Sequence, residues 1–539
     1  MSAASEVDRF DYVVIGAGSA GAAVAARLSE NSAHRVLLLE AGGMDRHPGF
    51  RLPLLMGAFI KSGIYNWGYA TEPEPHLDGR RIAWPRGKVI GGTSTLNGMV
   101  YIRGVPSDYD GWGLKGWSWN EVLPFFRKAE GHEHRRDPWH GTSGPLHVRR
   151  ATGGHPLAEA FVGAGAQAGY PTNDDFNGPT QEGFGLYDFT IKNGRRCGTA
   201  RAYVRPSLGR KNLKLATHAL VRRLIVEDGR VSGVEYERGG QICRADAARE
   251  VVLSAGAINS PQILMLSGIG DSRELKNIGI EPVLDLPGVG RNLQDHFDCA
   301  LVYESREPVS LYSQLRFDRA VLAVLRGMVF GAGPATVFPY EGGAFIKVDP
   351  RESNPDIQVH FMHGREDTAQ LHAFSPPRPE TKHGFTIRVS QLRPDSRGQV
   401  RLRSADPHDA PLMTANYLAA DRDVQTTIQG LRAMRRVVEQ RAFDRYRGRE
   451  IAPGPEVASD VDFRHWLSRA GGTTFHPVGT CAMGHGPDAV VDEQLRLHGL
   501  AGLRIADASI MPRIISGNTN AASIMIGEKA AALISGGTA

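Results

Sequence analysis

The sequence predicts an α+β fold, in which a Rossmann-like dinucleotide-binding domain carries an antiparallel sheet with helices as a cap. Three observations lead to this prediction. A glycine-rich turn lies between a short apolar strand and an alanine-rich helix near the N-terminus. Segments with alternating apolar and polar residues lie far downstream, at 356–361 and 399–403. The chain has 539 residues, which is more than one hydrophobic core usually supports.

Residues 11–15 (DYVVI) form the first predicted strand, because β-branched and aromatic side chains dominate this segment. The turn GAGSAG follows directly, and residues 22–28 are predicted to be helical. In such a turn Gly16 permits the tight bend, Gly18 lets the backbone approach a pyrophosphate, and Gly21 lets the helix pack on the strand. The free N–H groups at the start of the helix would bind the pyrophosphate.

A second strand is predicted at residues 34–39, and Glu40 stands at its end. A carboxylate at this place can accept hydrogen bonds from both hydroxyl groups of an unphosphorylated ribose, as in NAD or FAD. A solvated acid at a strand end is the alternative interpretation of Glu40. The glycine motif alone does not distinguish the two dinucleotides.

Residues 84–104 contain too many glycines and interruptions for a regular helix or strand. They are predicted to form a loop around a ligand. Gly91 and Gly92 would let the backbone approach closely, while Thr93 and Asn97 offer hydrogen bonds. A similar glycine-bounded segment, 256–270, follows an apolar strand and is predicted to form a turn and a short helix.

Two polar motifs lie near the C-terminus. The first is FHPVGTCAMG, which contains His476, and the second is SGNTN, which contains Asn518 and Asn520. Together with the glycine-rich segments, they resemble the glucose–methanol–choline (GMC) oxidoreductase family over residues 10–534. Within that family the sequence is most similar to the bacterial choline dehydrogenase and aliphatic alcohol dehydrogenase branch, notably in PRGK and VYIRG of the 84–104 loop.

The resemblance implies FAD as the cofactor. Some members of the family attach it covalently through a histidine of the Gly-Gly loop, and Leu96 stands at that position here, so we expect non-covalent binding. The glycine motifs and the resemblance together predict that the following residues contact FAD: Gly16, Gly18, Ser19, Ala20, Gly21, Glu40, Ala41, Trp67, Arg86, Gly91, Gly92, Thr93, Asn97, Gly98, Met99, Val100, Val221, Ala255, Gly256, Asp507, Ala508, Asn518 and Thr519.

The cofactor motifs are spread over separate stretches, which implies a discontinuous FAD-binding domain. Its predicted parts are residues 1–155, 200–300 and 455–539. The predicted substrate domain consists of residues 156–199 and 301–454, where alternating patterns favour an antiparallel sheet with one covered face.

In GMC enzymes the histidine of the His-Pro-Val-Gly-Thr motif faces the flavin, and a histidine or asparagine of the later motif stands beside it. These positions match His476 and Asn520. Alcohol oxidation requires a base for the hydroxyl proton, and histidine, with an ordinary pKa of about 6.5, is suited to this role. Asn520 cannot accept a proton, so it is expected to bond the substrate oxygen and to begin a helix over 521–533.

These residues predict FAD-dependent oxidation of an alcohol, primary and aliphatic or aryl, to the aldehyde, with electrons passed to a quinone-like acceptor. An oxygen-using alcohol oxidase stays open as an alternative, as do a hydroxynitrile-lyase-type member, a NAD-dependent dehydrogenase and a flavin-binding electron carrier. Choline would require a binding acid or aromatic cage, which the sequence does not identify. His360 is consistent with a substrate-facing or a structural role, and His296 with support near the cofactor.

Composition argues against other classes of function. The net charge is +5 and the basic residues are scattered, which disfavours nucleic-acid binding. Cys197, Cys243, Cys299 and Cys481 show neither zinc-site spacing nor a disulfide pattern, so no metal is expected. The polar N-terminus and the absence of a spanning apolar run predict a cytoplasmic protein. Contact with the periphery of a membrane needs no such run and stays open.

Overall fold

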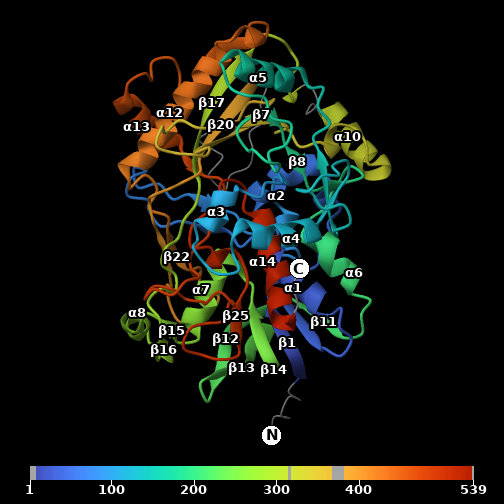
Figure 1. Ribbon diagram of the computed structural model, residues 1–539, viewed down its shortest axis with the longest axis vertical. Helices are drawn as coiled ribbons and strands as arrows, with labels where there is room; N and C mark the ends of the chain where they lie inside the picture. Colours follow the sequence, from blue (N-terminus) through green and yellow to red (C-terminus); the bar gives the residue numbers. More distant parts are fainter. Residues whose placement is uncertain (1–7, 313–316, 367–381, 537–539) are drawn as a thin grey trace.

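The computed structural model describes residues 8–312, 317–366 and 382–536. Two seven-stranded sheets dominate it, one in the lower and one in the upper half of Figure 1. Helices and strands alternate along the chain and pack on both sheets, which confirms the predicted α+β class. Within the described residues, no helix combines the length and the apolar character that crossing a bilayer requires.

The first sheet has the strand order β11-β2-β1-β14-β13-β12, with β25 beside β14. Its strands are β1 (Asp8–Ile15), β2 (Val36–Glu40), β11 (Leu213–Thr217), β12 (Ala219–Glu227), β13 (Arg230–Arg238), β14 (Gln241–Leu253) and β25 (Leu503–Ile505). The apolar runs of β1 and β2 pair in parallel and are buried on both faces, as is usual for parallel sheets. Strands β12, β13 and β14 form an antiparallel meander.

Three helices position the lower half of the cavity described below. They are α1 (Ser19–Leu28), α7 (Gly256–Leu266) and α14 (Asn520–Ser535). Helices α1 and α14 pack closely because both expose small residues at their contact: a Cβ at Gly527 would lie 2.4 Å from the Ala20 carbonyl oxygen. Glu528 of α14 pairs with Arg27 of α1 at 2.8 Å. The predicted helix 521–533 is therefore present and begins beside the glycine turn.

The second sheet has the order β23-β17-β20-β19-β18-β7, with β24 beside β17. Its strands are β7 (Gly183–Leu186), β17 (Phe297–Ser305), β18 (Gly342–Ile346), β19 (Ile357–Met362), β20 (Gly384–Gln391), β23 (Arg447–Ala452) and β24 (Gly472–Thr473). All pairings are antiparallel. Strand β17 begins before residue 300 and β24 lies beyond 455, so this sheet extends past the predicted limits of the substrate domain.

The expectation of one covered face for this sheet is wrong. Strands β19 and β20 are buried along their whole length. Helices α5 (Pro156–Gln167) and α12 (Asp421–Val438) contact these strands, while His360 and Arg388 line the internal cavity. The alternating segment at 399–403 is separate: among the described strands, β21 (Gln399–Arg401) pairs with β22 (Leu412–Thr414) alone.

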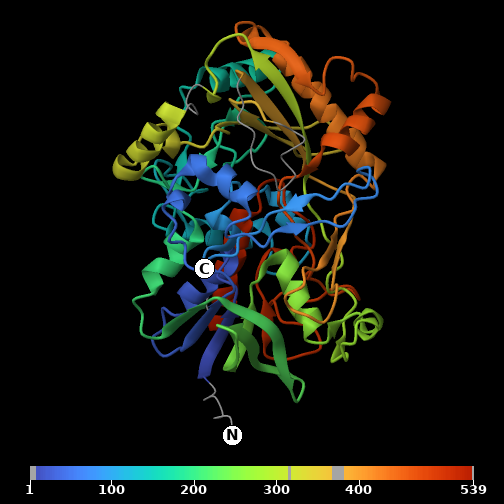
Figure 2. The same cartoon turned by 180° about the vertical axis from the view of Figure 1, so that it is seen from behind.

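Helix α10 (Phe317–Phe330) lies at the periphery of the upper half, on the side away from α12 and α13 (Asp460–Ala470), as Figure 2 shows from behind. One side of α10 packs through Ala323, Val324 and Met328 against a cluster that contains Leu52 and Leu54. Its opposite side is exposed to solvent.

Candidate active site

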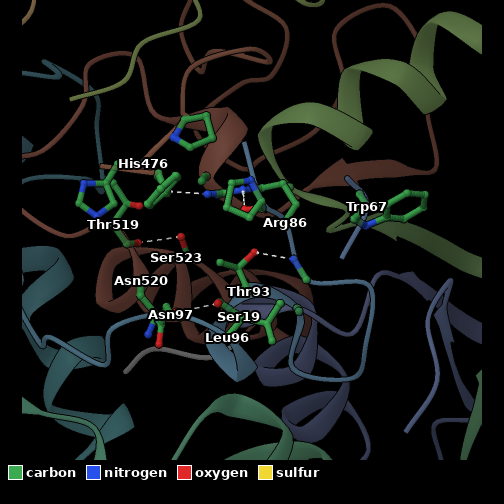
Figure 3. A pocket seen from close by; sticks show the side chains of 18 of the residues that line it. Ser19, Trp67, Arg86, Thr93, Leu96, Asn97, His476, Thr519, Asn520 and Ser523 are labelled. Carbon is green, nitrogen blue, oxygen red and sulfur yellow. Dashed lines mark hydrogen bonds between the residues drawn. The ribbon is translucent and has the colours of Figure 1, made fainter. Parts of the chain in front are cut away.

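A cavity of about 1010 Å³ lies between the two sheets, and residues of both sheets line it. Of the residues predicted to contact FAD, all except Gly21 and Gly91 line this cavity, and so do both predicted catalytic residues, His476 and Asn520 (Figure 3). Gly21 and Gly91 lie behind the wall, where each permits a close backbone contact. The structure therefore brings together segments that are far apart in the sequence.

The lower end of the cavity has the form of a pyrophosphate cradle. Gly16 has a φ of +94°, which permits the tight turn after β1. A Cβ at Gly18 would meet no atom within 4 Å, so this backbone faces open cavity. A Cβ at Gly21 would lie 2.0 Å from the Gly16 carbonyl oxygen, which explains why only glycine fits there. Helix α1 starts at Ser19 without a side-chain cap, and its free N–H groups suit an anion.

Glu40 lines the cavity at the end of β2 and is only 6% exposed, so it is not a solvated surface acid. Its Oε2 accepts the Ala17 N–H at 3.0 Å, and its Oε1 accepts the Gly42 N–H at 2.8 Å. Burial raises the pKa of this carboxyl to about 7. Its position fits a contact with the ribose hydroxyls, since each oxygen retains a further acceptor site.

The 84–104 loop covers the cradle. A Cβ at Gly92 would lie 2.8 Å from the Gly18 Cα, so the two glycine motifs are in direct contact. Arg196 donates from Nη1 to the Asn97 carbonyl oxygen at 2.6 Å and to its Oδ1 at 2.9 Å, which holds the loop. Leu96 lines the cavity and is buried against an apolar cluster, and its side chain offers no atom for a covalent bond to a cofactor.

His476 is buried at the upper end of the cavity. Its Nδ1 lies 2.9 Å from Thr474 Oγ1 and 3.0 Å from His296 Nδ1, and its backbone N–H donates to Asp295 Oδ1 at 2.8 Å. Asn518 Nδ2 lies 3.1 Å from His476 Nε2. Burial, with smaller contributions from His296, His360 and Arg86, holds the pKa of His476 well below 6.5. The imidazole is therefore neutral at neutral pH.

The two asparagines of the SGNTN motif have different neighbours. Asn518 Oδ1 accepts from Gln358 Nε2 at 2.9 Å, which orients the amide so that its NH₂ group faces His476 Nε2. Nε2 is thus the acceptor, and the ring proton resides on Nδ1. Asn520 Oδ1 accepts from Ser19 Oγ at 2.7 Å, beside the pyrophosphate cradle. The prediction placed Asn520 beside the base, whereas the structure places Asn518 there.

The reason for this difference is local. The residues before α14 lie in a turn, and the helix itself begins at Asn520, with Thr519 in the N-cap position. Sequence spacing does not determine which side chain of such a turn points toward a given neighbour. Asn518 was predicted as a cofactor contact and Asn520 as the neighbour of the base. Both line the cavity, but Asn518 lies beside the base and Asn520 lies beside the cofactor cradle.

Sequence reasoning missed Gln358 and gave Asp295, in the run predicted to support the cofactor region, no role of its own. Asp295 accepts hydrogen bonds from the backbone N–H of His476 and from the hydroxyl groups of Thr473 and Tyr417. It therefore fixes the segment that carries the base. The predicted supporting role of His296, next in the chain, pointed to this region but not to the carboxylate itself.

The upper end of the cavity is aromatic and charged. Glu366 accepts from Arg388 Nη1 at 3.2 Å and from the Tyr340 hydroxyl, and Arg388 also pairs with Asp298. Burial raises the pKa of Asp298 to about 7. The rings of Tyr340 and Phe338 stack, with centroids 5.1 Å apart. His360 also lines this end, and burial lowers its pKa to about 3, so it is neutral.

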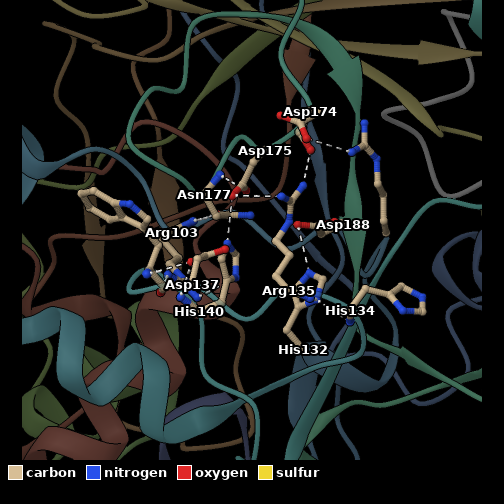
Figure 4. Close-up of polar contacts among 12 residues, drawn as sticks. Arg103, His132, His134, Arg135, Asp137, His140, Asp174, Asp175, Asn177 and Asp188 are labelled. Atoms are coloured by element: carbon tan, nitrogen blue, oxygen red, sulfur yellow. Dashed lines mark hydrogen bonds and ion pairs between the residues drawn. The ribbon is translucent and has the colours of Figure 1, made fainter.

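A second polar cluster lies outside the cavity (Figure 4). Glu130 pairs with Arg103 and with His140 Nδ1 at 3.0 Å, and His140 Nε2 lies 3.0 Å from Asp175. The two carboxylates raise the pKa of His140 to about 9 against the effect of its burial. Glu130, His132 and His140 are close enough to share a metal ion. A protonated His140 has no free lone pair, however, and Arg103 already neutralises Glu130, so we interpret the cluster as a buried ion network.

Comparison with known proteins identifies the family. The chain matches the family model of GMC oxidoreductases in its N-terminal part over residues 10–298 and in its C-terminal part over 394–527. It is 45% identical over 526 residues to the oxygen-dependent choline dehydrogenase of Sinorhizobium fredii (strain NGR234), covering 97% of this chain and 94% of that protein. The oxygen-dependent choline dehydrogenase of Burkholderia cenocepacia (strain HI2424) is 45% identical over 537 residues, with 98% and 94% covered.

Solved structures agree with this result. Pyridoxine 4-oxidase from Mesorbium loti superposes with a TM-score of 0.87 at 34% identity, over 98% of both chains. Formate oxidase from Aspergillus oryzae RIB40 superposes with a TM-score of 0.92 at 28% identity, over 99% of both chains. The predicted family and the predicted cofactor are thereby confirmed. The chain belongs to the GMC oxidoreductase family and is an FAD-dependent enzyme that acts on CH–OH groups.

Proposed function

We propose that the protein oxidises a primary alcohol to the aldehyde, with His476 as the base. The observation that carries this proposal is the neutral His476, whose Nε2 faces the cavity as an acceptor beside the amide of Asn518. FAD, when bound, supplies the hydride acceptor at flavin N5. The substrate hydroxyl would replace the Asn518 amide as donor to Nε2 and give up its proton there. Asn518 would then donate to the substrate oxygen, the role that sequence reasoning assigned to Asn520.

Charge at the upper end of the cavity favours an uncharged alcohol. Among the described residues, Glu366 lines this end, and its carboxylate is already paired with Arg388. A quaternary ammonium group would therefore meet a carboxylate that already has a guanidinium partner. The stacked rings of Phe338 and Tyr340 and the side chain of Met362 suit an aliphatic or aryl group instead.

Choline is the second candidate. The relatives from Sinorhizobium fredii and Burkholderia cenocepacia are named choline dehydrogenases. The acid and the aromatic rings that choline would require are present in Glu366, Tyr340 and Phe338, although the sequence did not identify them. Choline binding would have to draw Glu366 away from Arg388.

For the electron acceptor we propose a quinone-like compound, with a cytoplasmic protein in peripheral contact with a membrane. Helix α10 supports this: its exposed side carries large apolar residues that are between 45% and 77% exposed, namely Val321, Leu322, Leu325, Val329 and Phe330. The opposite side of α10 packs on Leu54, which lines the active-site cavity. An exposed apolar helix face of this kind suits interfacial binding. The relatives' names favour the alternative, an enzyme that uses oxygen.

The proposal is tested by following the visible flavin band under anaerobic conditions while primary aliphatic alcohols, aryl alcohols and choline are added separately. We expect bleaching by an uncharged primary alcohol and formation of the aldehyde. Readmission of air distinguishes the acceptors, because rapid recovery of the band indicates an oxidase. A yellow protein that cleaves a cyanohydrin and is bleached by no alcohol would contradict the proposal and identify a lyase. The His476→Ala protein controls for contaminating activities.

A further inference from the structure

A second cavity, of about 220 Å³, lies behind the 84–104 loop and shares no lining residue with the active-site cavity. Arginine dominates its wall. The charged residues that line it are Arg51, Arg195, Arg196, Arg201, Arg205 and Asp45. Five arginines and one aspartate thus line this small cavity, which leaves an excess of positive charge around it.

Within the part of the chain that the structure describes, one of these arginines has an ion-pair partner. Arg205 pairs with Asp45, with Nη2 and Oδ1 2.6 Å apart. The other four form no ion pair with any residue that the structure describes. Arg195 donates from Nη2 to the Met328 carbonyl oxygen at 2.8 Å, a neutral acceptor. Like charges held together without counter-charge repel one another, so an anion in this cavity would be strongly favoured.

Arg196 is the most deeply placed of them, at 6% exposure. Its Nη1 donates a hydrogen bond to Asn97 Oδ1, but its Nε is buried and has no hydrogen-bond partner within the described residues. Burial alone lowers the pKa of this guanidinium to about 9, and no carboxylate opposes the shift. A buried cation with a free donor is costly unless a ligand supplies the missing acceptor.

We propose that this cavity binds a phosphoryl anion, either inorganic phosphate or the phosphate of a lipid headgroup. The flat, multidentate guanidinium group matches phosphate oxygens, and five arginines line this cavity. A dianion would neutralise part of the excess charge and offer an acceptor to Arg196 Nε. The inference is independent of the alcohol that the enzyme oxidises.

The site connects two functional parts of the molecule. Arg196 holds Asn97, whose side chain lines the cofactor cavity, so an anion that orders Arg196 would also stabilise the loop over the cofactor. Arg195 bonds the end of α10 at Met328, and α10 carries the exposed apolar side. A lipid phosphate could therefore reach the cavity when α10 lies on a bilayer.

The direct test is calorimetric titration of the FAD-loaded protein with inorganic phosphate, against chloride at the same ionic strength. We expect saturable binding at one site. The double variant Arg51→Gln/Arg201→Gln should weaken it by roughly tenfold or more, since hydrogen bonds between charged groups are lost. Arg273→Gln, an exposed arginine of helix α8 (Ser272–Asn277), is the matched control and should bind like the wild type. Flavin absorbance verifies that each variant is folded.

Co-sedimentation with vesicles identifies the source of the phosphate. Vesicles of phosphatidylcholine with phosphatidic acid should bind the wild type more tightly than the double variant, and added inorganic phosphate should compete, if a headgroup occupies the site. Phosphate binding without this vesicle effect assigns the site to a free anion. Absence of saturable phosphate binding, together with equal vesicle binding by both proteins, would overturn the proposal. In wild-type crystals, soaked tungstate should occupy this cavity, and tungstate found only elsewhere would also overturn it.

Discussion

The two asparagines that precede and begin α14 give the most discriminating prediction. Asn518 lies 3.1 Å from His476 Nε2, whereas Asn520 lies 2.7 Å from Ser19 Oγ in the pyrophosphate cradle. Asn518→Ala should therefore slow flavin reduction, while Asn520→Ala should weaken FAD binding. The two substitutions remove the same amide two positions apart, so each serves as the control for the other.

The magnitudes follow from the hydrogen bonds. In the reaction the Asn518 amide would donate to an oxygen that develops negative charge, and such a bond contributes about 1.5–3 kcal/mol. Its loss corresponds to roughly a 10- to 100-fold slower reduction. The bond between Asn520 and Ser19 is neutral and contributes about 0.5–1.5 kcal/mol, so FAD affinity should fall by about 2- to 10-fold.

Both quantities can be measured on the same preparations. Anaerobic stopped-flow absorbance gives the limiting rate of flavin reduction at saturating alcohol, and titration of the apoprotein with FAD gives the dissociation constant. The reasoning would be refuted if Asn520→Ala slowed reduction at full FAD occupancy while Asn518→Ala left the rate unchanged. That result would restore the assignment made from the sequence.

Three further predictions concern the cofactor and the buried ion network. Gly18→Val should yield a folded but colourless protein, because the added side chain would occupy the open cradle; a fully yellow variant would contradict this. Acid precipitation should release FAD into the supernatant, since Leu96 cannot form a covalent bond; colour in the pellet would contradict this. The pKa of His140 is raised from 6.5 to about 9 by Glu130 and Asp175. Protonated His140 therefore stabilises the folded state fully below pH 6.5, and this stabilisation is lost as the pH rises through 9. The free energy of unfolding should fall by on the order of 3 kcal/mol over this range, measured as a decrease of the unfolding midpoint with pH. The His140→Gln protein should show a flatter pH profile, and equal profiles for the two proteins would refute the network.

Much of the lower half of the molecule could be predicted from the sequence, because its signals are local. The glycine turn, the second strand with Glu40 and the helix after residue 520 each depend on a short segment and its backbone geometry. Such segments retain their conformation in nearly any context that has a parallel sheet. As a result, nearly every residue predicted to contact the cofactor lines one cavity.

The upper half was harder, because its site is made by pairing of distant strands. The register of the second sheet brings Gln358 on β19 to Asn518 and Arg388 on β20 to the cavity, and a loop brings Asp295 to His476. Alternation in the sequence does not show that both faces of a sheet are covered. The exchange of Asn518 and Asn520 has a similar origin, since a turn does not fix side-chain direction.

The central claim is that His476 is the base. The measurement that tests it most directly is single-turnover reduction of FAD-loaded His476→Ala by the alcohol that bleaches the wild type. We predict unchanged flavin content and a reduction rate about 10²- to 10⁴-fold lower, the usual contribution of a general base. A variant that retains FAD and is reduced at the wild-type rate would contradict the account and require another proton acceptor.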